Sequence, residues 1–262
     1  MLELIRDALS CHPWRDLIHY FPTIDSTNNY AKTLALQGAP HGTVVIASHQ
    51  SGGRGRMGRS FSSPENMGVY LSLLLRPQCS PAELMHLTCA CAVAGCNAVE
   101  TAIGLRPQIK WTNDLLLNKR KVGGILTELV IGPQEICAII GIGINCRQEI
   151  TDFPQEIQSF AGSLSMASQK DISLPHVIYC LLESLLEMDR HLLTERDTMI
   201  ARYTQDCATI GQDISLVCGD RIRHGHAIAI ASDGGLVVRF SDGHEEIVQS
   251  GEVSIRGMYG YV

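Results

Sequence analysis

The sequence has no cysteine framework, although it contains ten cysteines. No CxxC pair occurs; Cys89, Cys91 and Cys96 fall in one predicted helix, and the others are scattered among apolar residues. Zinc sites and disulfide scaffolds need regular spacings, so neither is predicted, and we assign no metal ligands. We expect reduced thiols that pack as small apolar side chains, as is usual in cytosolic proteins.

The chain also lacks the pattern of a secretory signal or a membrane span. It begins MLELIRDALSCHPWRD, where acidic residues interrupt any apolar core. The most apolar stretch, residues 84–103, contains His86, Asn97 and Glu100, which favours a buried helix over a membrane helix. We therefore predict a soluble, cytoplasmic protein that does not act in a membrane.

An excess of positive charge is missing as well. The formal net charge is -6, which argues against a general binder of nucleic acid or of membrane surfaces. Any bound anion must therefore be met by a local basic cluster. Hydrophobic residues make up 45% of the 262 residues, enough for a sizeable core in one large domain with a small appendix.

The order of the predicted elements is that of an α/β domain followed by a β-rich tail. Helices are predicted after the cap Asp25-Ser26-Thr27-Asn28, and at 80–103, 174–192 and 194–207. Strands are predicted at 43–48, 69–75, 109–117, 124–130 and 136–145, with a loop at 149–173. We predict a mixed sheet with packed helices in residues 1–210 and a small β-barrel in residues 211–262.

The stretch SGGRGRMGRS, residues 51–60, places four glycines among three arginines. Glycine allows positive φ and close backbone approach, and arginine offers a planar fork of donors for carboxylate or phosphate. Taken alone, the stretch fits a flexible loop, a nucleic-acid patch or a loop that closes around one anion. It is not a P-loop, because the GxxxxGK[ST] spacing is absent.

A second polar stretch is KWTNDLLLNKRKVGG, residues 110–124. As one strand, it would place Lys110, Thr112 and Asp114 on the same face. A two-residue turn at 118–119 would put Lys121 opposite Leu116 and diagonal to Asp114, close enough for one small ligand to touch both. A structural Lys–Asp pair is the alternative, but Gly123 and Gly124 favour close approach of a ligand.

Two shorter motifs remain open or are rejected. The GxG of GIGIN, residues 141–145, lacks the third glycine and the following helix of a dinucleotide fold, so its glycines indicate close approach of a ligand or another backbone. Ser26-Thr27-Asn28 is a helix cap that could also bind a polar ligand.

In this order the motifs resemble those of the biotin–protein ligase family: Ser26-Thr27-Asn28, Gln50 with GGRGRMGR, KWTND, RKVGGIL with Glu128, and GIGIN. The resemblance covers residues 24–145, and the tail after Gly211 is similar to that family's SH3-like domain. It implies an enzyme that uses MgATP to convert biotin to biotinyl-5′-AMP, and then transfers biotin to a lysine of a biotin carboxyl carrier domain, as in acetyl-CoA carboxylase.

The resemblance also implies roles for individual residues. The catalytic group would be Lys121, Asp114, Arg56 and Lys110. Biotin or its adenylate would contact Ser26, Thr27, Asn28, Gln50, Gly53, Arg54, Gly55, Arg56, Lys121, Gly123, Gly124 and Asn145. The ATP side would involve Arg56, Arg59, Phe61, Asn113, Asp114 and Asn145. The family often forms dimers, so a homodimer is consistent with it.

The chain departs from the family pattern at three positions. Thr112 stands where proline is frequent, Phe61 where tryptophan is frequent, and Met57 where a basic residue is frequent.

Some members carry an N-terminal DNA-binding domain; only 25 residues precede Ser26, so we expect a ligase without it. The nearest alternative is lipoate–protein ligase, because Ser51-Gly52-Gly53 is similar to an SGG run of that family. The alternative from another class is a module that binds nucleic acid through the arginine loop.

Overall fold

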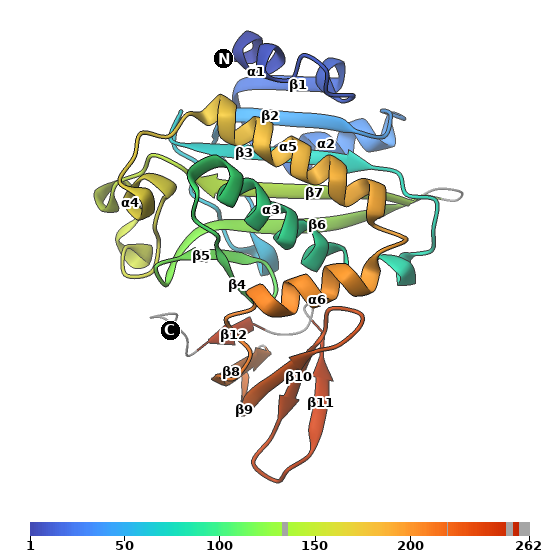
Figure 1. The fold of residues 1–262 in the computed structure, drawn as a ribbon, viewed down its shortest axis with the longest axis vertical. Coiled ribbons are helices and arrows are strands. Elements are labelled where there is room, and N and C mark those ends of the chain that lie inside the picture. Colours follow the sequence, from blue (N-terminus) through green and yellow to red (C-terminus); the bar gives the residue numbers. More distant parts are fainter. Residues whose placement is uncertain (133–135, 219, 250–253, 257–262) are drawn as a thin grey trace.

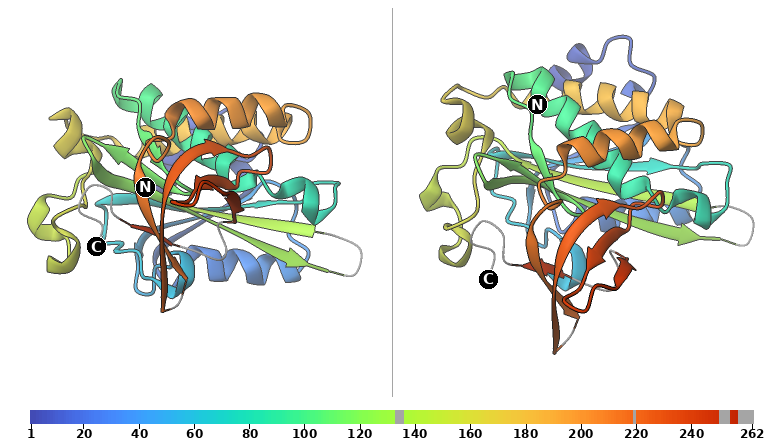
Figure 2. Two further views of the ribbon diagram at one scale, coloured as in Figure 1. Left: turned by 90° about the horizontal axis from the view of Figure 1, so that it is seen from below. Right: turned by 60° about the horizontal axis from the view of Figure 1, so that its bottom comes forward.

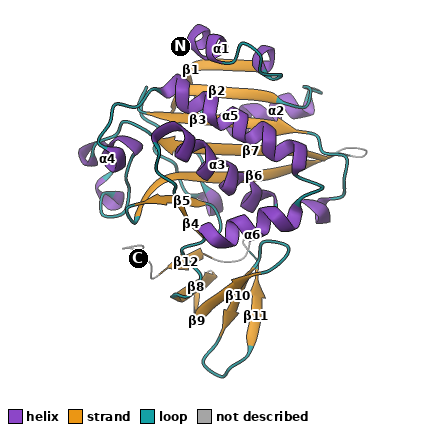
Figure 3. Ribbon diagram, viewed as in Figure 1, coloured by secondary structure: helices purple, strands orange, loops and turns teal. Residues whose placement is uncertain are grey.

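The computed structural model describes residues 1–132, 136–218, 220–249 and 254–256. A seven-stranded mixed sheet lies at its centre, in the order β1-β2-β3-β7-β6-β5-β4 (Figures 1 and 3). Its strands are β1 (Ile18–Ile24), β2 (Thr43–Gln50), β3 (Gly68–Leu75), β4 (Gln108–Lys110), β5 (Asp114–Leu117), β6 (Arg120–Ile131) and β7 (Ile136–Asn145). Among the described strands of this sheet, β1 and β2 are the one parallel pair, so the predicted mixed α/β fold is confirmed.

Helices cover both faces of this sheet (Figure 2). On one face lies α2 (Thr27–Leu36); on the other lie α3 (Leu87–Ile103), α5 (Leu174–His191) and α6 (Arg196–Asp206), with α1 (Leu2–Ala8) against α5. The alternation of β2 explains the two cores: Val44 and Ile46 join the large cluster under α3 and α5, whereas Val45 joins the small one under α2. Each core follows from one strand face.

The predicted helix at 80–103 is wrong in one respect, because it is two elements. The capping box at Ser80 exists, but it opens a short 3₁₀ helix, Pro81–Leu84, and α3 begins only at Leu87. The stretch Pro81–Ile103 is long and apolar enough to cross a membrane, yet most of it is buried inside the protein, among the residues described. Its apolar residues fill the core between α5 and the sheet.

The predicted single strand at 109–117 is also wrong. The chain turns at 111–113, so β4 and β5 form a hairpin in which Lys110 pairs with Asp114. Tertiary contacts hold this turn: Tyr203 of α6 donates its hydroxyl hydrogen to the carbonyl of Thr112 at 2.9 Å, and Thr209 binds the N–H of Trp111 at 2.9 Å. Lys110, Thr112 and Asp114 therefore do not share one strand face.

Two N-terminal elements were not predicted, β1 and α1. The sequence of β1, IHYFPTI, contains Pro22 and polar side chains without a regular alternation, so it does not indicate a strand. It forms because β1 is an edge strand whose single partner is β2. The loop predicted at 149–173 contains the short helix α4 (Leu164–Ser168) and two 3₁₀ turns.

The C-terminal part forms a separate five-stranded antiparallel sheet, in the order β11-β10-β9-β8-β12. Its strands are β8 (Asp213–Cys218), β9 (Arg221–Ile230), β10 (Leu236–Arg239), β11 (Glu245–Val248) and β12 (Ser254–Arg256). This sheet contacts the large domain beside α6 and β4 (Figure 1). The indole N–H of Trp111 donates to the carbonyl of Gly234 at 3.0 Å, and Arg196 donates to the carbonyl of Ser232 at 2.9 Å.

The ten cysteines are free thiols, and seven of them are buried. Cys89, Cys91 and Cys96 belong to the large apolar core, as expected for small hydrophobic side chains. Within the described ranges, no three histidine, cysteine or acidic side chains gather as a metal site.

His41, just before β2, contacts Asp189 of α5, and this contact provides a test of the fold. Its Nε2 lies 2.9 Å from a carboxylate oxygen of Asp189, and its Nδ1 lies 3.1 Å from the backbone nitrogen of Arg76. The hydrogen bond with Asp189 raises the pKa of His41 above its ordinary value of 6.5. Protonated His41 is therefore favoured in the folded state, and its contribution is full below pH 6.5 and is lost as the pH rises through the folded-state pKa.

We expect His41→Gln to lower the free energy of unfolding more at pH 5.5 than at pH 8.5. Chemical denaturation of both proteins at these pH values measures the difference. His12 and His86 titrate in the opposite direction, because burial lowers the pKa of each, but they are present in both proteins and cancel. An equal difference at both pH values would contradict the assignment.

Candidate active site

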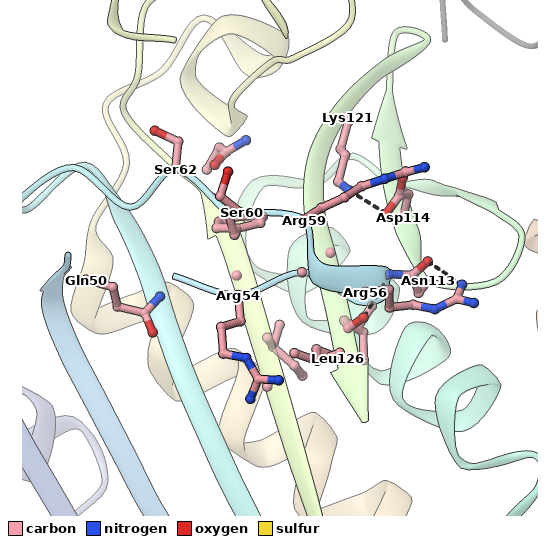
Figure 4. Close-up of a pocket in the computed structure, with 18 of the residues that line it drawn as sticks. Gln50, Arg54, Arg56, Arg59, Ser60, Ser62, Asn113, Asp114, Lys121 and Leu126 are labelled. Atoms are coloured by element: carbon pink, nitrogen blue, oxygen red, sulfur yellow. Dashed lines mark hydrogen bonds and ion pairs between the residues drawn. The ribbon is translucent and has the colours of Figure 1, made fainter. Parts of the chain in front are cut away.

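A cavity of about 340 Å³ opens on the α2 side of the sheet. It is lined by the N-terminus of α2, by parts of β2, β5, β6 and β7, by the loop at 54–62 and by the segment Phe153–Ala161 (Figure 4). These segments are far apart in the sequence. The sheet order brings them together, because β3, β7 and β6 are neighbours at its centre.

Two opposite charges meet at one end of the cavity. The ammonium group of Lys121 lies 2.5 Å from a carboxylate oxygen of Asp114, and both side chains are largely buried. Asn118 and Lys119 form the predicted two-residue turn with positive φ, and Lys121 pairs with Leu116 as predicted. Because Asp114 and Leu116 are two residues apart in β5, Lys121 and Asp114 lie on one face of the sheet, diagonal to each other.

Arg56 adds a second cation at the same end. Its guanidinium lies 3.2 Å from the amide oxygen of Asn113 and 3.4 Å from the hydroxyl of Thr112, and Figure 4 shows it beside Asn113. Burial lowers the pKa of Arg56, and the nearby Asp114 carboxylate opposes this effect. A half-buried guanidinium whose hydrogen-bond partners are neutral keeps its charge available for an anionic ligand. Lys110, also buried, lines the same end of the cavity.

Arg54 takes a different direction from Arg56, away from Lys121 in Figure 4. It lies 3.2 Å from the carboxylate of Glu128 and 3.0 Å from the amide oxygen of Asn29. Glu128 also accepts from Lys32 at 2.6 Å. Burial raises the pKa of Glu128, but the hydrogen bonds from Lys32 and Asn28 outweigh it, so its pKa lies below the ordinary value. Arg54 therefore ties the glycine–arginine loop to α2 and β6.

The opposite end of the cavity is a network of neutral polar groups. The amide oxygen of Gln50 accepts from the N–H of Thr27 at 2.9 Å and from its hydroxyl at 3.1 Å. Gln50 in turn donates to Ser63 at 3.0 Å. Beneath them, the hydroxyl of Ser72, which has no exposed surface, lies 2.8 Å from Thr27 and 2.5 Å from Asn28. The predicted cap is confirmed, because Ser26 accepts from the N–H of Asn29.

The glycines of GIGIN are explained by side chains that lie against them. A Cβ at Gly141 would lie 2.2 Å from the amide oxygen of Asn28, and one at Gly143 would lie 2.5 Å from the ring of Phe61. Both glycines also line the cavity. Close approach was predicted for this strand, and here the neighbours that need the space are Asn28 and Phe61.

The segment Phe153–Ala161 forms a wall that sequence reasoning did not identify. Phe153, Ile157 and Phe160 line the cavity, as do Trp111 and Leu71. The signal available was three large apolar side chains in an otherwise polar loop. Nearby, the buried Asn145 donates to the carbonyl of Gly162 at 3.0 Å and lies 3.3 Å from the amide nitrogen of Gln148.

Most residues predicted for the site line this one cavity. They are Ser26, Thr27, Asn28, Gln50, Arg54, Gly55, Arg56, Arg59, Phe61, Lys110, Asn113, Asp114, Lys121, Gly124 and Asn145. Gly53 and Gly123 are outside its lining. A Cβ at Gly53 would lie 2.4 Å from the carbonyl oxygen of Phe61, and one at Gly123 would lie 2.9 Å from that of Gly143, so both glycines allow backbone packing.

The arrangement suits a ligand with an uncharged polar head and an anionic end. The head would meet Thr27 and Gln50, and the anion would meet Lys121 and Arg56, with aromatic and aliphatic side chains between them. Fixed cations in a half-buried site stabilise negative charge that develops during a reaction.

Comparison with known proteins agrees with this geometry. Residues 20–145 match the biotin/lipoate A/B protein ligase family, and residues 209–256 match the biotin protein ligase C terminal domain. The fold is similar to that of a biotin protein ligase from Aquifex aeolicus solved in complex with biotin and ATP. The TM-score is 0.77 at 27% identity, covering 91% of this chain and 98% of that one.

Two curated relatives show the same kinship. The bifunctional ligase/repressor BirA of Bacillus spizizenii is 37% identical over 93% of this chain and 75% of its own length. A biotin–[acetyl-CoA-carboxylase] ligase of Mycobacterium tuberculosis is 33% identical over 58% of this chain and 55% of its own length. With both matched regions present in order and one cavity holding the family's motifs, this chain belongs to the biotin protein ligase family.

Proposed function

We propose that this protein activates biotin with ATP and transfers it to a lysine of a carrier protein. In the first step a biotin carboxylate oxygen attacks the α-phosphorus of ATP, the bond to the β-phosphate bridge breaks, and pyrophosphate leaves. In the second, the acceptor amine attacks the acyl carbon, a C–N bond forms, and AMP leaves as the amine loses a proton. The observation that carries the proposal is Lys121 beside Arg56 in a cavity whose other end is neutral and polar.

The neutral end fits the head of biotin, a cyclic urea. One N–H of Gln50 donates to Ser63, and its oxygen is held by Thr27, so the amide nitrogen has a fixed orientation at the cavity surface. Its second N–H is then available to a ligand carbonyl. Burying a urea without such partners would cost several kcal/mol, on the order of 2–7, which gives this end its selectivity.

The charged end fits the two anions that react. Carboxylate and phosphate repel each other, and Lys121, Lys110 and Arg56 offset that repulsion from one side. We assign Arg59, Phe61, Asn113 and Asn145 to the nucleotide side, where Phe61 presents an aromatic ring over Gly143. Asp114 holds Lys121 in place at 2.5 Å before any ligand binds.

Magnesium would enter with the nucleotide. Mg²⁺ in such sites takes one or two carboxylates together with phosphate oxygens, and Asp114 supplies a carboxylate in the lining of this cavity. The ion would neutralise phosphate charge. We place no further protein ligand on it.

The glycine–arginine loop would act as a lid over the reacting groups. It is a narrow loop in which Gly55 donates to the carbonyl of Arg59 at 2.7 Å and Phe61 donates to that of Gly53 at 2.9 Å. Met57 and Gly58 at its tip have positive φ. A lid of this kind admits both substrates and then keeps water from the mixed anhydride. The nucleic-acid alternative is disfavoured, because Arg54 is paired with Glu128 and Arg56 is half-buried beside Asn113.

The acceptor is proposed to be a biotin carboxyl carrier domain. Relatives named biotin–[acetyl-CoA-carboxylase] ligase support this choice. A homodimer, as the resemblance allows, is a further proposal.

Substrate choice is tested by ATP–pyrophosphate exchange. We expect exchange that depends on biotin and is at least tenfold slower with lipoate, because lipoate has no urea to pair with Gln50 and Thr27. Incubation with biotin, MgATP and a carrier domain, followed by intact mass measurement, then checks transfer. Exchange with lipoate alone would replace biotin by lipoate as the substrate.

The central role of Lys121 is tested by Lys121→Ala. We expect the rate of exchange to fall by roughly a hundredfold or more, since a fixed cation at the phosphoryl group is lost, while circular dichroism shows an intact fold. Lys119→Asn is the matched control: Lys119 lies two residues away in the turn, outside the cavity, and asparagine tolerates its positive φ. Near-normal exchange by Lys121→Ala would show that another residue holds the reacting anions.

A further inference from the structure

The wall formed by Phe153–Ala161 is attached directly to the backbone of Lys121. The N–H of Lys121 donates to the carbonyl of Phe160 at 2.7 Å, and the N–H of Gly162 donates to the carbonyl of Lys121 at 2.9 Å. These two bonds form a parallel bridge between Lys121 and Ala161. Lys121 therefore has β5 on one side and this wall on the other.

Arg120 holds that wall in place. Its Nη1 donates to the carbonyl of Gln158 at 2.9 Å and to that of Ala161 at 2.8 Å. Hydrogen bonds from a charged donor are about twice as strong as neutral ones. The two carbonyls belong to the residue two before Phe160 and to the residue after it, so one guanidinium nitrogen fixes the turn that carries the Phe160 ring into the cavity wall.

The close approach at this point has its own signature in the sequence. A Cβ at Gly162 would lie 2.8 Å from the Cβ of Arg120. The chain can pass Arg120 at this distance only because residue 162 is glycine. The contact is thus built from both sides, by the arginine of β6 and by the glycine that ends the wall.

We propose that Arg120 is a positioning residue for the adenylate-forming step, acting through Lys121 and the wall Phe153–Ala161. This inference rests on the proposed function. Arg120 does not line the cavity, so it does not touch the substrates. It fixes the wall to the backbone of Lys121, and the wall in turn limits where the Lys121 ammonium and the ligand can lie. A displacement of about 1 Å at such a site costs on the order of a hundredfold in rate.

The test compares Arg120→Met with Arg120→Lys. Methionine keeps an apolar stem and removes the donors, whereas a lysine ammonium can still donate to two carbonyls from one nitrogen. We expect Arg120→Met to lower kcat for biotin-dependent exchange by roughly ten- to a hundredfold and to raise KM for biotin, both expressed per folded enzyme. Arg120→Lys should recover most of both parameters.

Arg147→Met is the matched control. Arg147 donates to the carbonyl of Ile172 at 2.8 Å, which is also a bond from an arginine to a backbone carbonyl. Ile172 follows the wall in the sequence, and Arg147 does not line the cavity. A purely structural loss reduces the amount of folded enzyme and leaves KM unchanged. If Arg120→Met behaves like Arg147→Met, with normal kcat and KM per folded molecule, the proposal is wrong.

Hydrogen–deuterium exchange separates this inference from the proposed function. In Arg120→Met we expect the amides of Lys121 and Gly162 to exchange on the order of tenfold faster, whereas Arg147→Met leaves them unchanged. If these amides keep their protection in Arg120→Met, Arg120 does not hold the wall against Lys121 and the inference is wrong. Suppose that these amides exchange faster in Arg120→Met but that the wild-type protein shows no biotin-dependent activity. The role of Arg120 in holding the wall would then be supported, and the assignment of biotin as substrate would be refuted.

Discussion

The contact between Lys121 and Asp114 is the constraint on which the site depends. Two charges taken out of bulk water are stable only when they are close and well oriented. Here the 2.5 Å separation depends on the tight turn at Asn118-Lys119, which sets the register of β5 against β6, and on the pairing of β6 with β7. The apolar residues of β6 and β7, together with the helices packed on the sheet, therefore keep Lys121 and Asp114 in contact.

The two ends of the cavity are stabilised by different physics. The charged end uses ion pairs and burial, whereas the neutral end uses a chain of hydrogen bonds from Ser72 through Thr27 to Gln50. The first holds cations close together at one end, and the second orients neutral donors and acceptors at the other. Between them the glycine–arginine loop and the wall Phe153–Ala161 cover the cavity, one tied through Arg54 and the other through Arg120.

The apolar runs of β2, β3 and β7 and the cap of α2 predicted these elements well, and the helix predicted at 174–192 is α5. It was wrong for residues 109–117, where Tyr203 and Thr209, about a hundred residues later, hold a turn that local propensity does not indicate. It also did not identify β1, since an edge strand with Pro22 looks like a loop. Errors arose where distant contacts override local preference.

By itself the sequence determined the family: its ordered motifs resemble those of biotin–protein ligases, and this resemblance pointed to Lys121, Arg56 and Asp114 as the charged groups of the site. Tertiary structure decided which of these groups meet, because hairpin register and sheet order are set by packing across the whole core. It sent Arg54 toward Glu128 and Arg56 toward Asn113, although both belong to one short loop. It also recruited Phe153, Ile157 and Phe160, whose role appears only once Arg120 and the backbone of Lys121 hold that segment against the cavity.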